Sequence, residues 1–190
     1  MKNRLKECTD SIYKSVQKLF LDFLVKNRLK KCTDSITEKH FFIEDGGDQK
    51  PAFISFENGE FEVTNNTNNS IYFLRTDSCL YNSKDPKRCD SVIYNDNTIC
   101  FIELKCIKPK NFADNSQNAK KQIEETIIDF QEHGVLQDKN REAFISLNCH
   151  KKKNGCYEPI TKRPTNSHVF ADFKIRLNTT LYYDTKKEFN

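Results

Sequence analysis

Asp90, Glu103 and Lys105 are the residues of this chain whose types and spacing best suit chemistry. Side chains alternate along a β-strand, so Glu103 and Lys105 point to one face, and a hairpin between the two acids would bring Asp90 beside Glu103. Two carboxylates and a backbone carbonyl, here that of Leu104, offer the oxygen ligands that Mg²⁺ and Mn²⁺ prefer. Such an ion activates water and polarises a phosphoryl oxygen, while the Lys105 ammonium holds the attacking water or offsets developing charge. The three residues therefore predict a metal-dependent site for phosphodiester hydrolysis.

Two short strands and a turn must position these residues. The turn is predicted at Asn95-Asp96-Asn97, because Asn and Asp tolerate positive φ and hydrogen-bond their own backbone. A hairpin closing there lays residues 91–94 beside residues 98–103. We expect one face of the second strand to be a core and the other to carry the chemistry. The first face holds Cys100, Ile102, Leu104 and Cys106, and the second holds Phe101, Glu103 and Lys105.

A structural interpretation of the same residues is also open. Asp90 and Glu103 could be solvated charges at strand ends, and Lys105 could be a surface lysine in an ion pair, as in most Glu-x-Lys tripeptides. The combination favours a site, because an acid, an apolar hairpin and Glu-x-Lys follow one another in the order that such a site needs.

This combination resembles the PD-(D/E)XK nuclease superfamily, also called restriction-endonuclease-like. The matching residues are Asp90, then Glu103-Leu104-Lys105, then a predicted helix that carries Gln122. The proline of the family name is not adjacent to the acid, since Pro86 lies four residues before Asp90. The resemblance covers about residues 70–150, and its short motif indicates a superfamily better than a substrate.

The resemblance implies a role for each matching residue. Asp90 and Glu103 would bind Mg²⁺ or Mn²⁺ together with the Leu104 carbonyl, Lys105 would assist the attacking water, and Gln122 would support the site. Gln122 equally fits a boundary glutamine of an amphipathic helix without a role.

The family also implies a third, helical acid, which Glu38 or Glu44 could supply, although each fits an ordinary surface carboxylate as well.

Strands flanked by two helices, with a hairpin feeding a crossover helix, predict an α/β fold with a mixed central β-sheet flanked by helices. The elements that we expect are a hairpin of residues 52–56 and 60–64 around Asn58-Gly59, a strand at 71–75, a loop at 109–115, a helix at 116–132 with Ala119, Ile123, Ile127 and Phe130 on its apolar stripe, a strand at 143–148, and one or two strands within 169–183.

The N-terminal residues 1–36 form a basic segment that contains a repeat. The eleven-residue segment Lys2–Ile12 recurs as Lys26–Ile36, with Lys31 in place of Glu7. Two copies are too few for a solenoid and indicate a recent duplication or a gene-model oddity. Apolar spacing predicts an amphipathic helix over residues 9–31, whose basic face fits either phosphate contact or ordinary solvation.

A second basic segment follows the strand at 143–148. Phosphate contact there would add salt-dependent affinity that does not depend on base sequence, although a merely solvated loop fits equally well. The candidate nucleic-acid-binding residues are Lys151, Lys152, Lys153, Lys162 and Arg163.

Composition limits the remaining possibilities. The 190 residues, with 15 Phe and 7 Tyr, predict a single domain over residues 1–190 with a substantial core. No run approaches a membrane span and no export signal is visible, so we expect a cytoplasmic protein whose eight cysteines are reduced thiols. The set Cys149, His150, Cys156 and His168 lacks the paired spacing of structural zinc sites.

The sequence thus predicts a divalent-metal-dependent endonuclease, with DNA as the favoured substrate, working in a restriction or anti-phage defence system. Two alternatives stay open: a non-catalytic module on the same fold that binds nucleic acid or protein, and a nuclease subunit active only with a partner. The net charge of +4 is modest for a stand-alone DNA binder and favours the partner-dependent form. A homodimer or a larger defence complex is compatible with both, and the choice of DNA over RNA stays open.

Overall fold

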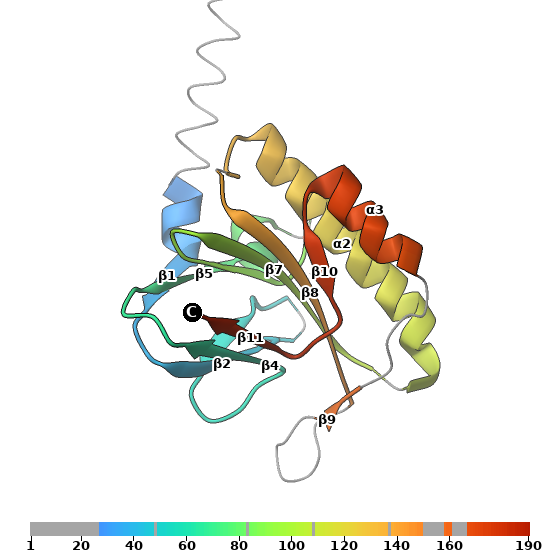
Figure 1. The fold of residues 1–190 in the computed structure, drawn as a ribbon. Helices are drawn as coiled ribbons and strands as arrows, with labels where there is room; N and C mark the ends of the chain where they lie inside the picture. Colours follow the sequence, from blue (N-terminus) through green and yellow to red (C-terminus); the bar gives the residue numbers. More distant parts are fainter. Residues whose placement is uncertain are drawn as a thin grey trace, which may run out of the picture.

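The described part of the chain forms two mixed β-sheets and a pair of helices in three layers (Figure 1). The computed structural model describes residues 27–190 except 48, 83, 108, 137, 150–157 and 161–166. A helical segment at 27–32 leads into the sheets. The elements are β1 (Thr33–Ile36), β2 (His40–Glu44), β3 (Phe53–Ser55), β4 (Phe61–Asn65), β5 (Ile71–Arg75), the helical segment η1 (Thr76–Leu80), β6 (Ser91–Tyr94), β7 (Thr98–Cys106), η2 (Pro109–Asn111), α2 (Phe112–Glu132), β8 (Asn140–Cys149), β9 (Glu158–Pro159), α3 (Ser167–Leu177), β10 (Thr180–Tyr182) and β11 (Lys186–Phe189).

The larger sheet has the order β1-β5-β6-β7-β8-β10, with β9 paired to β8. Strands β5, β6 and β7 run antiparallel, whereas β8 and β10 continue the sheet in parallel, so a crossover must join β7 to β8. That crossover is α2, which covers one face together with α3 (Figure 1). The predicted α/β class and mixed central sheet are confirmed, but helices cover only one of its faces.

A smaller sheet, which the sequence did not predict, covers the other face. Its order is β11-β4-β2-β3, so β2 lies between β3 and β4. The predicted hairpin around Asn58-Gly59 is therefore wrong, although both strands exist. The chain instead crosses the end of β2, where a Cβ on Gly59 would lie 2.7 Å from the Phe42 Cβ and 2.9 Å from the Ile43 carbonyl oxygen. The glycine is needed for this close approach and not for a two-residue turn.

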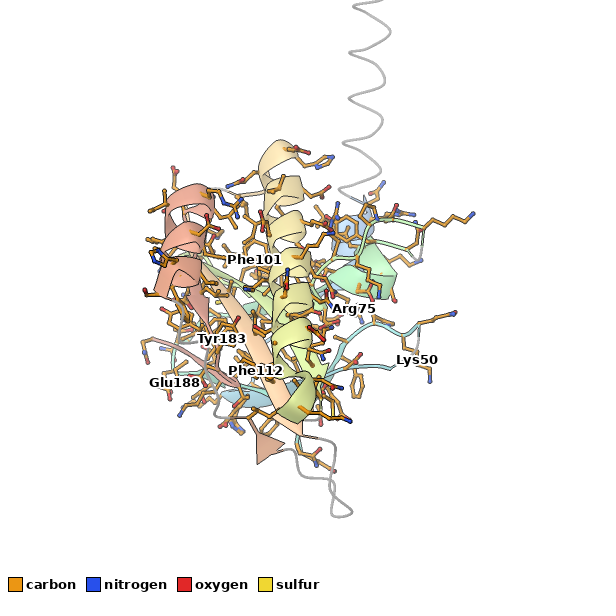
Figure 2. All side chains as sticks on the ribbon, turned by 90° about the vertical axis from the view of Figure 1, so that its right-hand side faces the viewer. Lys50, Arg75, Phe101, Phe112, Tyr183 and Glu188 are labelled. Atoms are coloured by element: carbon orange, nitrogen blue, oxygen red, sulfur yellow. A yellow bond between two sulfur atoms is a disulfide. The ribbon has the colours of Figure 1, made fainter. Side chains whose placement is uncertain are left out.

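The central sheet is buried on both faces. Phe101 belongs to the core beneath α2, where its ring meets Phe130 edge to face at 5.7 Å. Ile102 and Leu104 belong to the core between the two sheets. Our expectation that only one face of β7 belongs to a core is therefore wrong. Figure 2 views the molecule from the helix side, with Phe101 and Phe112 along α2.

Two further expectations fail at the end of the chain and at its cysteines. The run 169–183 contains α3 before β10, because Phe173 and Leu177, four residues apart, share the buried side of a helix. Cys32 and Cys79 form a disulfide with Cα atoms 5.9 Å apart, which contradicts reduced thiols for this pair. Cys100 is free and buried in the core, as predicted. Among the described residues, no helix is both long and apolar enough to cross a membrane.

Candidate functional site

The predicted hairpin forms, with residues 91–94 beside residues 99–102. Ser91 pairs with Ile102 and Tyr94 with Ile99, and the intervening turn is closed by the Asn95 side chain. Asn95 Oδ1 accepts from the N–H groups of Asn97 and Thr98 at 2.9 and 2.8 Å. This is the turn chemistry expected for Asn, and it fixes which residues of β6 and β7 face one another.

Asp90 lies just before β6, and its side chain makes the hydrogen bond that a further residue of this strand would otherwise make. The β6 ladder begins at Ser91, so the N–H of Leu104 on the neighbouring strand has no backbone partner there. Asp90 Oδ2 accepts this N–H at 2.6 Å. In a strand, the carbonyl of a residue points to the same side as its N–H, so the Leu104 carbonyl also faces the Asp90 side. The structure thus brings Asp90 and the Leu104 backbone together at the end of β7.

Glu103 is a fully buried carboxylate with an unsatisfied oxygen. Its exposed fraction is 0%, and the side chain of Lys105 on the same face is 24% exposed. Glu103 Oε1 forms an ion pair with Lys105 Nζ, whereas Oε2 is buried and has no hydrogen-bond partner. An unsatisfied buried carboxylate oxygen destabilises the fold, and such groups call for an explanation in function.

The electrostatics of the two acids reflect their burial. Burial raises the pKa of Asp90 to about 6, although the Lys105 ammonium and the Leu104 N–H oppose the shift. Burial and the nearby Asp90 carboxylate raise the pKa of Glu103 well above its usual range, again against the pull of Lys105. A cation placed between the two acids would favour their charged forms, since an opposite charge lowers the pKa of a carboxyl group.

Lys105 remains a cation in this setting. Burial alone lowers the pKa of Lys105, but the carboxylates of Glu103 and Asp90 outweigh it and raise that pKa above its ordinary value. An ammonium that keeps its proton cannot accept one from water. Lys105 is therefore suited to positioning and charge stabilisation rather than to proton abstraction.

The structure places further acids, which the sequence did not single out, around the motif. Glu60, immediately before β4, is 4% exposed, and burial raises its pKa to about 7. The hydrogen bond from the Asp45 N–H opposes this shift, whereas the nearby Asp45 and Asp90 carboxylates add to it. Glu60 Oε2 accepts from the Asp45 N–H at 2.8 Å. Asp77 in η1 raises the pKa values of both Asp90 and Glu103. Glu60 follows Gly59 in a segment with the composition of an ordinary turn. No local sequence pattern therefore indicates that this acid is buried near the motif.

The two acids proposed from sequence as a third member differ in position. Glu38 is exposed and accepts from the Thr37 N–H at 3.1 Å, and it is not among the groups that perturb Asp90 or Glu103. Glu44 lies in β2 and acts on Glu60. Figure 2 shows Lys50 of the β2–β3 loop and Arg75 at the end of β5 on one side of the molecule, opposite Glu188. Asp45 of the loop after β2 and Asp77 of η1 both raise the pKa of Asp90, so these two segments flank the same region.

Gln122 is near the motif but contacts the backbone before Asp90. Its Nε2 donates to the Arg88 carbonyl at 2.9 Å, and one turn later Thr126 Oγ1 accepts from the Cys89 N–H at 2.9 Å. These two contacts fix residues 88–89 against α2 and so set the position of Asp90, the next residue in the chain. Gln122 therefore acts through the chain that carries Asp90.

The α2 face also anchors the Arg88 side chain. Its guanidinium lies 3.5 Å from Glu125 and 3.3 Å from Asp129, and 5.0 Å from the centre of the Tyr81 ring. With the two backbone contacts, the helix holds this segment at four positions along one face.

A polar groove opens beside Lys105 on the helix side. Gln122, Lys87, Asn118 and Lys121 line it together with Lys105. Lys121 is 75% exposed on its side chain, and it lies 3.8 Å from a helical glutamate. Of the motif residues, Lys105 lines this groove, whereas Asp90 and Glu103 do not.

Several residues singled out from the sequence lie in segments that the structure does not describe. Lys151, Lys152, Lys153, Lys162 and Arg163 lie outside the described residues, as do most of the helix predicted at 9–31 and the side chains of the cysteine and histidine set apart from His168. Within the described ranges, no three His, Cys, Asp or Glu side chains come together as a metal-binding group. Comparisons of the chain with protein-family models, with curated proteins and with solved structures each found no match.

Proposed function

We propose that this protein is a metal-dependent nuclease of the PD-(D/E)XK type that hydrolyses phosphodiester bonds, most readily in DNA. The observation that carries the proposal is the Glu103 carboxylate, fully buried with one oxygen unsatisfied, beside Asp90 and paired with Lys105. A fold that only needed an ion pair would place it at the surface, because an isolated buried carboxylate is costly.

The arrangement of strands supports the proposal. Three antiparallel strands, β5, β6 and β7, are followed by the α2 crossover and the parallel strand β8. The motif stands at the end of β7, and the helix that follows touches the segment before Asp90. This order is the one that the resemblance implies for its core.

The donor set suits Mg²⁺ or Mn²⁺. Asp90, Glu103 and the Leu104 carbonyl are all oxygen donors, and the unsatisfied Glu103 oxygen lacks a partner that a cation would supply. Mg²⁺ keeps several waters and is held by one or two carboxylates, so a cluster of three acidic ligands is not required. The bound ion would supply an activated water and polarise the phosphoryl group.

The residues of the chain have separate tasks. Asp90 and Glu103 hold the cation, and the Leu104 N–H fixes the orientation of Asp90. Lys105 stays charged and orients the attacking water or stabilises charge on the phosphate. Gln122 keeps Asp90 in place through the backbone, and the groove with Lys87 and Lys121 offers a path for the substrate.

A non-catalytic binding module, or a subunit that acts only with a partner, is the second candidate. In its favour, the described residues contain no group of three metal-ligating side chains. The two candidates differ in metal dependence, because only hydrolysis requires Mg²⁺ or Mn²⁺.

The test is to incubate the protein with plasmid DNA, linear single-stranded DNA and RNA, with Mn²⁺ and with EDTA. We expect cleavage only with the metal, and at least about 100-fold slower cleavage in Glu103→Gln and Lys105→Met, the scale of losing a charge-stabilising group. Glu188→Gln, an exposed acid on the opposite side, is the matched control and should keep full activity. Full activity in both site variants would refute the proposal.

A further inference from the structure

We propose that the edge of the larger sheet is a binding site for either copy of the N-terminal repeat. In this inference, Arg4–Ile12 can replace Arg28–Ile36 beside β5, and Cys8 then replaces Cys32 in the disulfide with Cys79. The first copy lies outside the described residues, and its sequence repeats that of the second copy, whose contacts the structure describes. The inference does not depend on the proposed nuclease activity.

The second copy contributes the outermost strand of the sheet (Figure 1). It forms β1, which pairs antiparallel with β5 from Thr33↔Leu74 to Ile36↔Ile71. Ile36 is 5% exposed in the core between the sheets, and Cys32 is 2% exposed and bonded to Cys79. Leu29 packs against the helix-side core.

Polar contacts complete this site. Asp34 forms an ion pair with Arg75 at 3.2 Å, and Thr33 Oγ1 donates to the Leu29 carbonyl at 2.6 Å. Every side chain that makes these contacts has an identical counterpart in the first copy. The counterparts are Leu5, Cys8, Thr9, Asp10 and Ile12.

The two copies differ at one position, where the contact with the site is made by the backbone and not by the side chain. Lys31 stands where the first copy has Glu7, and the Lys31 residue is exposed. Its recorded contact is through the backbone, since Arg75 donates to the Lys31 carbonyl at 3.5 Å. A glutamate offers the same carbonyl, so the site accepts both copies.

The covalent exchange needs no external oxidant. The Cys8 thiolate attacks the Cys79 sulfur, the bond between Cys32 and Cys79 breaks, and a bond between Cys8 and Cys79 forms. Cys32 leaves as a thiolate and takes up the proton that Cys8 gave up, so one disulfide replaces another.

Chain connectivity favours the second copy. Residues 37–39 link it to β2, whereas residues 13–39 would link the first copy to the same strand. The link of the first copy is roughly ninefold longer than that of the second. The probability that a loop closes falls with the three-halves power of its length, so the second copy is preferred about 30-fold. The first copy is therefore the minor occupant until the second is disabled.

Peptide mapping of air-oxidised Cys32→Ser under non-reducing conditions tests whether Cys8 can take the place of Cys32. In this variant molecular oxygen supplies the oxidation that joins the Cys8 and Cys79 thiols. Trypsin releases Thr76–Lys84 joined to Glu7–Lys14 if Cys8 takes over, and we expect this linked peptide to dominate. Adding Ile12→Asp leaves Cys8 in place but removes the residue that must be buried, and should reduce the linkage at least about tenfold. Equal linkage with and without Ile12→Asp, no linkage at all, or linkage found only in a covalent dimer would each overturn the proposal.

A thermal unfolding cycle under reducing conditions tests the non-covalent exchange. Ile36→Asp should lower the Tm modestly, because the first copy substitutes, and Ile12→Asp alone should leave it unchanged. The double variant should lose clearly more Tm than the sum of the single variants. Additive losses would show that the first copy is no substitute.

Discussion

Glu60→Gln is expected to remove a pH-dependent loss of stability. Burial raises the pKa of Glu60 to about 7 from an ordinary 4.5, so the folded state holds this proton more tightly than the unfolded chain does. The stabilising contribution is therefore fully present below pH 4.5 and is lost as the pH rises through 7. A shift of this size corresponds to about 3 kcal/mol of unfolding free energy.

The variant keeps the local structure that holds Glu60. The Glu60 carbonyl accepts from Ser146 Oγ at 2.7 Å and from Asn148 Nδ2 at 2.9 Å, and neither bond involves the carboxyl group. A glutamine side-chain oxygen can still accept the Asp45 N–H. The substitution thus removes the ionisation and little else.

The assay is urea unfolding of the native protein and the variant between pH 4.5 and pH 8.5. The two should be equally stable near pH 4.5, and the variant should become more stable by up to about 3 kcal/mol at pH 8. Titrating groups that do not interact with Glu60 cancel in this difference, so only Glu60 and the acids coupled to it contribute. Glu188→Gln, at an exposed acid, should show a constant difference. A constant difference for Glu60→Gln as well, or a variant less stable than the native protein at pH 8, would refute the reasoning.

Four further outcomes are expected. Glu103→Gln should lose hydrolysis yet raise unfolding free energy by about 1 kcal/mol or more, measured by urea unfolding, because it removes a buried charge with an unsatisfied oxygen. Lys105→Met should lose hydrolysis but still bind Mn²⁺ in calorimetry, since the lysine is not a ligand. Gln122→Ala should lower the unfolding free energy by about 1 kcal/mol and weaken Mn²⁺ binding. Lys121→Ala, in the same groove, should leave Mn²⁺ binding unchanged. Cys79→Ser should lower the unfolding free energy by about 4 kcal/mol, the value that the loop-entropy relation gives for this disulfide. Because Cys79 is the partner of either repeat copy, this substitution removes the disulfide whichever copy occupies the site.

The motif hairpin was predictable because its signals are local. Alternation, the Asn95 turn and the apolar runs all act within residues 91–106, and the structure has the expected hairpin. The apolar stripe of α2 was equally predictable, and Gly134, with φ +65°, lies just beyond the end of this helix. The helix itself starts at Phe112, before the predicted residue 116.

The second sheet and the acids near the motif were not predictable in this way. Pairing of β11 with β4 joins residues far apart in sequence, and no local pattern encodes it. Asn58-Gly59 has the composition of a hairpin turn, yet its glycine serves a close crossing over β2. Glu60 owes its burial to that crossing. Tertiary packing also turned the aromatic run before β10 into α3, overriding β-propensity.

The contacts of α2 with residues 88–89 set an order of assembly for the motif. A nascent chain that ends at Cys106 already contains Asp90, Glu103 and Lys105, but not the glutamine and threonine that fix the segment before Asp90. Residues 88–89 therefore reach their final position only after the crossover helix has been synthesised and has packed on the sheet. The placement of Asp90 depends on a helix that follows it in the chain by more than twenty residues.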